Sequence, residues 1–95
     1  MFVVLLRFSG NKARAGELME GHNQWIAQGF NDGVFLVVGS LQPNQGGAII
    51  AHNITREKLE ERISQDPFVT ESVVSSEILE IGPTRVDERL QTILG

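Results

Sequence analysis

Two segments of the chain, residues 2–8 and 34–40, have the composition of β-strands but are apolar on both faces. In residues 2–8 only Arg7 is charged, and in residues 34–40 only Ser40 is polar. Strands with two apolar faces are typical of a sheet that is covered on both sides. The fold must therefore cover both faces of its sheet, and a single layer of helices covers only one of them.

Residues 12–31 predict an amphipathic helix, because apolar residues recur there at helical spacing. The residues on this apolar side are Ala15, Leu18, Met19, Trp25, Ile26, Gly29 and Phe30. His22 projects between them and therefore faces whatever the helix packs against. An imidazole in this position either handles protons or is a buried, hydrogen-bonded core group.

A second helix is expected after the third strand, which we place at residues 48–52, beyond the loop that contains Gly46 and Gly47. Thr55 is the expected N-cap, and the helix ends before Pro67. Asp66 follows on the side of this helix that faces inward. An acidic side chain at the C-terminus of a helix opposes the helix dipole, so Asp66 needs another explanation.

The last strand is expected at residues 73–81, where serines and glutamates interrupt the apolar pattern, as an edge strand tolerates. Thr84 with Asp87 resembles a capping box. The apolar spacing that follows predicts a short amphipathic helix at the C-terminus, with Val86, Leu90, Ile93 and Leu94 on its apolar side.

The order of these elements is βαββαβ plus a C-terminal helix, and it predicts a ferredoxin-like α+β fold with a four-stranded antiparallel sheet. A chain of 95 residues with 41% hydrophobic content fits one domain, residues 1–95, of which 84–95 form a C-terminal extension. Both main helices then cover the same face of the sheet. We expect a homodimer that packs sheet against sheet to cover the other face.

The composition excludes several classes of function. The formal net charge is -4 and the eight lysines and arginines are scattered among acids, so neither nucleic acid nor an anionic membrane is an expected partner. The absence of cysteine excludes disulfides, thiolate nucleophiles and the usual structural zinc sites. The apolar start of the chain is too short for a signal peptide. These features predict a cytoplasmic protein.

His22 and Asp66 lie on the inward sides of two helices that this fold places next to each other. A carboxylate there could hold the imidazole in one tautomer, as in acid–base sites. The competing interpretation is structural, with Asp66 capping the turn at Pro67 and His22 bonded to a backbone carbonyl. A solvent-accessible cavity beside His22 would favour the functional interpretation.

Three further residues are candidates for smaller roles. Ser40 lacks the Gly-x-Ser-x-Gly context of a nucleophile and is expected at most to bind substrate. Trp25 shares the side of His22 and either stacks on a ligand or belongs to the core. His52 with His22 and Asp66 would make a metal site only if the fold brought them together, which no local spacing predicts. The glycines match no nucleotide-binding pattern, so no cofactor is expected.

Several of these residues together resemble the YciI-like (YCII-related) family, small dimers with a ferredoxin-like fold in the dimeric α/β-barrel group. The resemblance covers most of the chain. It rests on the apolar first strand, His22, the Gly33 turn, Gly39-Ser40, Gly46-Gly47, Asp66-Pro67-Phe68-Val69 and Pro83. The chain departs from the family in having Gly39-Ser40 where Gly-Pro is frequent, and in its extension from Thr84 to Gly95.

The resemblance implies a His-Asp dyad formed by His22 and Asp66 in an active site. It further implies cofactor-independent lyase or isomerase chemistry on a small metabolite, with Ser40 and Trp25 as candidate substrate contacts. The alternative is a non-catalytic dimeric module that binds a small ligand or assists another enzyme. A third possibility is that both residues are structural and the protein acts through its surface.

Overall fold

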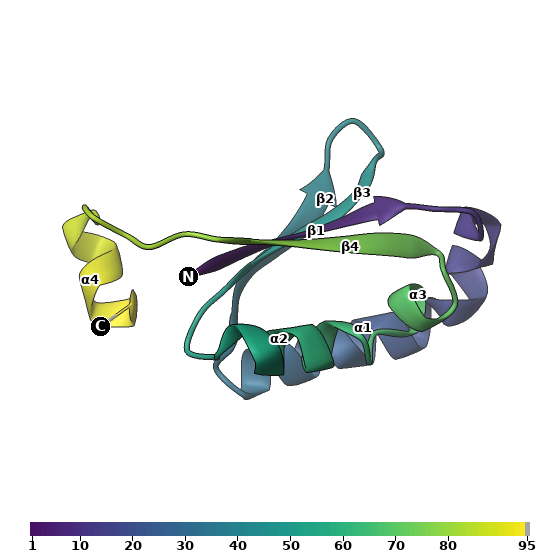
Figure 1. Cartoon of the computed structure of the whole chain (residues 1–95). Helices are drawn as coiled ribbons and strands as arrows, with labels where there is room; N and C mark the ends of the chain where they lie inside the picture. Colours follow the sequence, from purple (N-terminus) through teal and green to yellow (C-terminus); the bar gives the residue numbers. More distant parts are fainter. Residues whose placement is uncertain (95) are drawn as a thin grey trace.

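The computed structural model describes residues 1–94, so Gly95, the end of the predicted extension, lies outside the described residues. The chain forms one four-stranded sheet, a layer of helices on one side of it, and a separate C-terminal helix (Figure 1). In chain order the elements are β1 (Phe2–Phe8), the 3-10 turn η1 (Lys12–Arg14), α1 (Ala15–Asn31), β2 (Phe35–Leu41), β3 (Gly46–Ala51), α2 (Arg56–Ile63), α3 (Pro67–Thr70), β4 (Val74–Glu80) and α4 (Glu88–Leu94).

The sheet is antiparallel throughout, with the strand order β2-β3-β1-β4. The architecture is therefore α+β and compatible with the expected ferredoxin-like fold. The two strands after the helices, β2 and β4, are the edges, and the polar composition of β4 agrees with that position. In the centre, Phe2 of β1 is in register with Ala51 on one side and Glu80 on the other.

The hydrophobic core lies between the sheet and the helices. Figure 1 shows α1, α2 and α3 on the same side of the sheet. Alternate residues of β1 face this layer, and Val4 is 0% exposed there. The other buried apolar residues are Phe2, Leu6, Val34, Phe35, Ile49, Ala51, Leu59, Ile63, Phe68, Val73 and Val74.

Regular alternation along residues 34–40 would place Val34, Leu36 and Val38 on one face of the sheet and Phe35 and Val37 on the other, and the structure departs from this expectation at one point. The pairing of β2 with β3 shifts between Phe35 and Val37, so one extra residue, Leu36, is inserted there. As a result Phe35 and Val38, which are paired with the buried residues Ala51 and Ile49, both face the core, and Val37 is 57% exposed on the other face. A β-bulge moves every following side chain to the other face, which a period of two cannot reveal.

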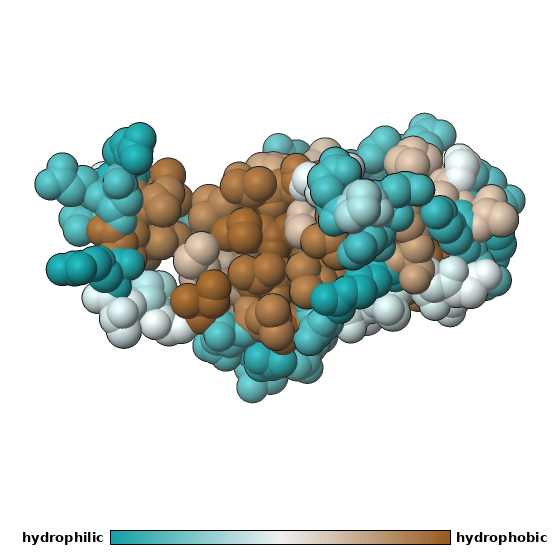
Figure 2. Space-filling view, turned by 90° about the horizontal axis from the view of Figure 1, so that it is seen from above, coloured by the Kyte–Doolittle hydropathy of each residue, from teal (hydrophilic) through white to brown (hydrophobic). Residues whose placement is uncertain are grey.

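The opposite face of the sheet is apolar and uncovered. Figure 2 shows hydrophobic residues gathered over the middle of this face. Val37 on β2 is 57% exposed and Leu79 on β4 is 45% exposed. Val3 and Ile50 are paired with each other between them. The uncovered apolar face that the first two strands predict is therefore present, and we call it the open face.

The C-terminal helix α4 follows an extended segment, residues 81–87, and stands beyond one end of the sheet (Figure 1). The expected cap at Thr84 is wrong, because α4 begins only at Glu88. Asp87 takes that role, and its Oδ1 accepts from the backbone N–H of Arg89 at 2.9 Å. Leu90 and Ile93 of α4 remain 42% and 49% exposed, so the helix does not pack its apolar side fully on its own sheet.

The second helix begins where it is expected and ends earlier. The Thr55 hydroxyl accepts from the backbone N–H of Lys58 at 3.2 Å, as an N-cap does. The helix ends at Ile63, because Ser64 and Gln65 form a turn before Asp66. No helix within residues 1–94 combines the length and the apolar composition needed to cross a bilayer.

An ion pair joins the end of α1 to α2 and makes the stability depend on pH. The Arg62 guanidinium donates to Asp32 Oδ2 at 2.9 Å, and this bond, with a second one from Gln28, holds the pKa of Asp32 below its usual range. A lowered pKa in the folded state stabilises the fold above the ordinary pKa of the carboxyl, and this contribution is lost as the pH falls through the folded value.

Asp32→Asn is therefore expected to make the melting temperature less dependent on pH in the acidic range. The melting temperature of the wild type should fall more than that of the variant between about pH 5 and about pH 2. Thermal unfolding followed by circular dichroism measures this difference. Glu20→Gln is the control, because Glu20 is an exposed acid of α1 that is in no ion pair within residues 1–94. If the melting temperatures of the wild type and Asp32→Asn fell equally over this pH range, the prediction would be contradicted.

Candidate functional site

His22 lies in the middle of α1, and its ring is held against α3. Its Nδ1 is 2.8 Å from Asp66 Oδ1, with 13% of the His22 side chain exposed and none of the Asp66 side chain. An ionised carboxylate only accepts hydrogen bonds, so Nδ1 is the donor in this contact. In the neutral ring this leaves the lone pair on Nε2.

Asp66 owes its position to the proline that follows it. Pro67 is the first residue of the short helix α3, and the residue before a proline is restricted to extended backbone, here with φ -63 and ψ 124. In this conformation Asp66 is the N-cap of α3, and its Oδ1 accepts from the backbone N–H of Phe68 at 3.0 Å. The expected position at the C-terminus of α2 is therefore corrected, and the expected cap at Pro67 is confirmed. Asp66 stands at a helix N-terminus, where the dipole favours a negative charge.

Glycine in α1 allows the close approach of the two helices. A Cβ atom added to Gly21 would lie 3.2 Å from Cγ of Pro67, so a larger side chain there would push α3 away. Phe68 of α3 then stacks on the His22 ring, with a centroid distance of 3.9 Å and an angle of 3°. The imidazole is fixed both in its plane, by Asp66, and across its face, by Phe68.

A cavity of about 320 Å³ lies beside His22, between the sheet and α1. Its lining includes the predicted residues His22 and Ser40. It also includes Gly46 and Gly47, which were expected in a loop before the third strand but are the first two residues of β3. Residues that were not expected to contact a substrate also line it: Leu6, Phe8, Met19, Asn23, Val38, Gly39, Phe68 and Val74. Two signals were available, because Asn23 is the neighbour of His22 and Phe68 follows Asp66-Pro67.

Trp25 is placed away from the cavity lining. Its indole Nε1 donates to the backbone carbonyl of Arg62 at 2.9 Å, and its ring meets Phe35 edge-on at 5.2 Å. Its centroid is 5.9 Å from that of His22. This arrangement favours a role of Trp25 in the core over a direct contact with a ligand.

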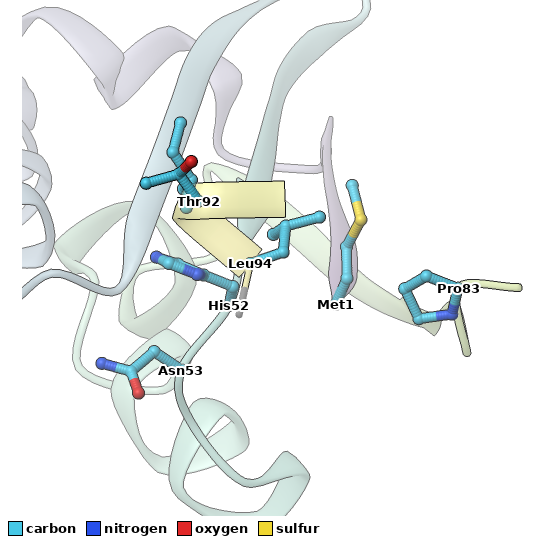
Figure 3. A pocket seen from close by; sticks show the side chains of 7 residues that line it. Met1, His52, Asn53, Pro83, Thr92 and Leu94 are labelled. Atoms are coloured by element: carbon cyan, nitrogen blue, oxygen red, sulfur yellow. The ribbon is translucent and has the colours of Figure 1, made fainter. Parts of the chain in front are cut away.

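His52 lies far from His22, at the other end of the sheet. It follows β3 and lines a second hollow of about 450 Å³ between α4 and the sheet, with Asn53, Met1 and Thr92 (Figure 3). The hollow contains neither His22 nor Asp66. Within residues 1–94 no group of three histidine, aspartate or glutamate side chains is arranged to hold a metal ion.

Comparison with models of known families and with curated proteins finds no match to this chain. The interpretation of the site therefore depends on its geometry and on the resemblance of its residues.

The contact between His22 and Asp66 predicts which nitrogen of the neutral His22 ring carries the proton. A carboxylate is a stronger acceptor than an amide oxygen, so the wild-type ring should carry its proton on Nδ1. Asp66→Asn is expected to convert this single form into a mixture in which Nε2 carries part of the proton. Long-range ¹H–¹⁵N NMR at about pH 9, where imidazole is ordinarily neutral, measures the populations. Asp32→Asn, the same change away from His22, is the control, and identical populations in wild type and Asp66→Asn would refute the prediction.

Proposed function

We propose that this protein is a cofactor-independent acid–base enzyme of the lyase or isomerase type that acts on a small metabolite. Two features of His22 together support the proposal. Its Nδ1 lies 2.8 Å from Asp66 Oδ1, and its side chain also lines a cavity. A histidine that only fills the core needs no cavity. A buried carboxylate behind an accessible imidazole is the arrangement that orients a general base.

In the proposed mechanism Nε2 of His22 removes a proton from a carbon next to a carbonyl group. Asp66 holds the ring in position and stabilises the imidazolium that forms. The imidazolium then returns the proton to another carbon of the same molecule, as an isomerase does, or to a leaving group, as a lyase does. The Ser40 hydroxyl is suited to bind the polar group of the substrate. The backbone of Gly46 and Gly47 is less suited to this role, because both residues are paired with β2 on one side and β1 on the other.

We further propose that the chain is a YciI-like protein. His22, the Asp66-Pro67-Phe68-Val69 element and Gly46-Gly47 support this proposal, because these family-like residues gather at one cavity. Of the two candidate substrate contacts, we keep Ser40 and assign Trp25 a structural role, in which it supports the helix that carries His22.

The assembly that we propose is a homodimer in which two open faces pack together to form a dimeric α/β barrel in the cytoplasm. The exposed apolar residues of the open face support it, since a patch of this kind on a single chain is normally covered. Sedimentation at micromolar concentration tests the dimer. A monomer under these conditions would exclude it.

The experiment for the proposed function is a screen of metabolite mixtures by NMR, with purified protein and no added cofactor. We expect one compound to be consumed, and either one isomer of it or two fragments that together make up its composition to appear. Saturable binding without any product would instead favour the alternative, a small-ligand-binding module. One observation favours that alternative: His22 is the sole titratable side chain among the described residues that line the cavity.

A further inference from the structure

The chemistry of the cavity beside His22 limits what it binds. Of its twelve lining residues, six carry large apolar side chains and three are glycines. The three polar side chains belong to His22, Asn23 and Ser40. Among the described residues of this lining there is no lysine, arginine, aspartate or glutamate. The cavity therefore offers an apolar wall with a few neutral hydrogen-bonding groups.

An anionic ligand is disfavoured in such a cavity. A carboxylate or phosphate loses its hydration on entry, and no cationic side chain of the lining replaces it. A carboxylate bound at Nε2 of His22 would also face the charge of Asp66 across the ring. The net charge of -4 adds a general repulsion of anions. An uncharged ligand meets none of these costs.

Gly47 determines how much room the cavity has. Ile49 and Ala51 of β3 are 1% and 0% exposed and face the helices, so Gly47 faces the same way by alternation. It is in register with Leu6 on one side and Ser40 on the other, and both line the cavity. A Cβ atom at Gly47 would have only the Gly39 carbonyl oxygen nearby, at 3.4 Å. The space in front of Gly47 is thus part of the cavity and is not filled by packed side chains.

We propose that this cavity accepts an uncharged, ring-sized compound with an apolar body and one carbonyl or hydroxyl group, and that Gly47 sets the largest size that fits. The inference rests on the proposed function in taking this cavity as the substrate site. The ring lies against the apolar wall formed by Phe68, Val38 and Leu6, and its polar group meets His22, Asn23 or Ser40.

A matched pair of probes, benzamide and benzoate, tests the charge selectivity, because the two share one ring and nearly one shape. Each is titrated into ¹⁵N-labelled protein at neutral pH while the amide signals of the lining residues are followed. We expect the dissociation constant of benzamide to be at least about tenfold lower than that of benzoate. Equal or tighter binding of benzoate would overturn the proposal, and so would the absence of benzamide binding up to its solubility limit.

Gly47→Val tests the size limit and is expected to weaken benzamide binding by about tenfold or more. Gly10→Ala is the control, because a Cβ atom there meets no atom within 4 Å and Gly10 is outside the cavity. Circular dichroism establishes that each variant is folded; if Gly47→Val is not, Gly47→Ala decides, with an expected loss of about threefold. Unchanged affinity in the folded variant would overturn the role of Gly47.

Failure of this inference is distinguishable from failure of the proposed function, because neither titration depends on turnover. A protein that prefers benzamide as described but converts no metabolite would refute the enzyme and leave the inference intact. A protein that turns over a metabolite yet prefers benzoate would do the opposite.

Discussion

His22→Asn is expected to lower turnover by about 10² to 10⁴-fold, the range that general acid–base groups contribute. Asparagine has no nitrogen that can take up a proton near neutral pH, so the step assigned to Nε2 is lost. Its side-chain nitrogen is attached to Cγ, as Nδ1 is in histidine, so it can still donate to Asp66 Oδ1, which His22 Nδ1 contacts at 2.8 Å. The buried carboxylate therefore keeps a hydrogen-bond partner, and the fold should remain stable.

The measurement compares initial rates of wild type and variant on the metabolite found by screening, with thermal unfolding recorded in parallel. Gln24→Ala is the control, because Gln24 is an exposed neighbour in α1 that does not line the cavity. Full turnover by a folded His22→Asn variant would exclude the mechanism. A large fall in melting temperature together with unchanged turnover would identify His22 as a structural residue.

The regular elements were predictable because each carries its own periodic pattern. The expected first strand, residues 2–8, agrees with β1, and the helix expected at residues 12–31 differs from α1 only by the 3-10 turn at its start. Thr55 was recognisable as an N-cap from its hydroxyl and position alone. Local propensity and burial point to the same answer in these segments, so the sequence is sufficient.

The short helix α3 was not predictable in the same way, because four residues carry no period. Without it, the sequence leaves two interpretations of Asp66 open: a position at the end of α2, where its charge opposes the helix dipole, and a cap of the turn at Pro67, which is the role it has in the structure. The sequence did place His22 and Asp66 on facing elements. Their separation depends on how closely α1 approaches α3, which Gly21 and Pro67 control through a tertiary contact. The bulge at Leu36 is likewise determined by pairing with β3 and not by local sequence.

Gly46→Ala is expected to destabilise the fold by at least about 3 kcal/mol, because it combines backbone strain with a collision. Gly46 has a φ of 131°, a conformation that residues with a Cβ rarely adopt. A Cβ atom there would lie 1.9 Å from the backbone carbonyl oxygen of Leu6. This oxygen belongs to the central strand β1 and cannot swing away as a flexible side chain would, so β3 must separate from β1 locally.

Urea unfolding at equilibrium measures the difference in the free energy of unfolding between Gly46→Ala and the wild type. Gly47→Ala is a matched control on the next residue, because its Cβ atom meets only the Gly39 carbonyl oxygen, at 3.4 Å, and Gly47 has no positive φ. We expect this control to remain within about 1 kcal/mol of the wild type. The contrast follows from which way each glycine faces: Gly46 lies against the backbone of β1, whereas Gly47 opens onto the cavity beside His22. Similar losses in both variants would mean that the hairpin between β2 and β3 shifts freely, and the cavity floor would then not be the rigid surface that a substrate site needs.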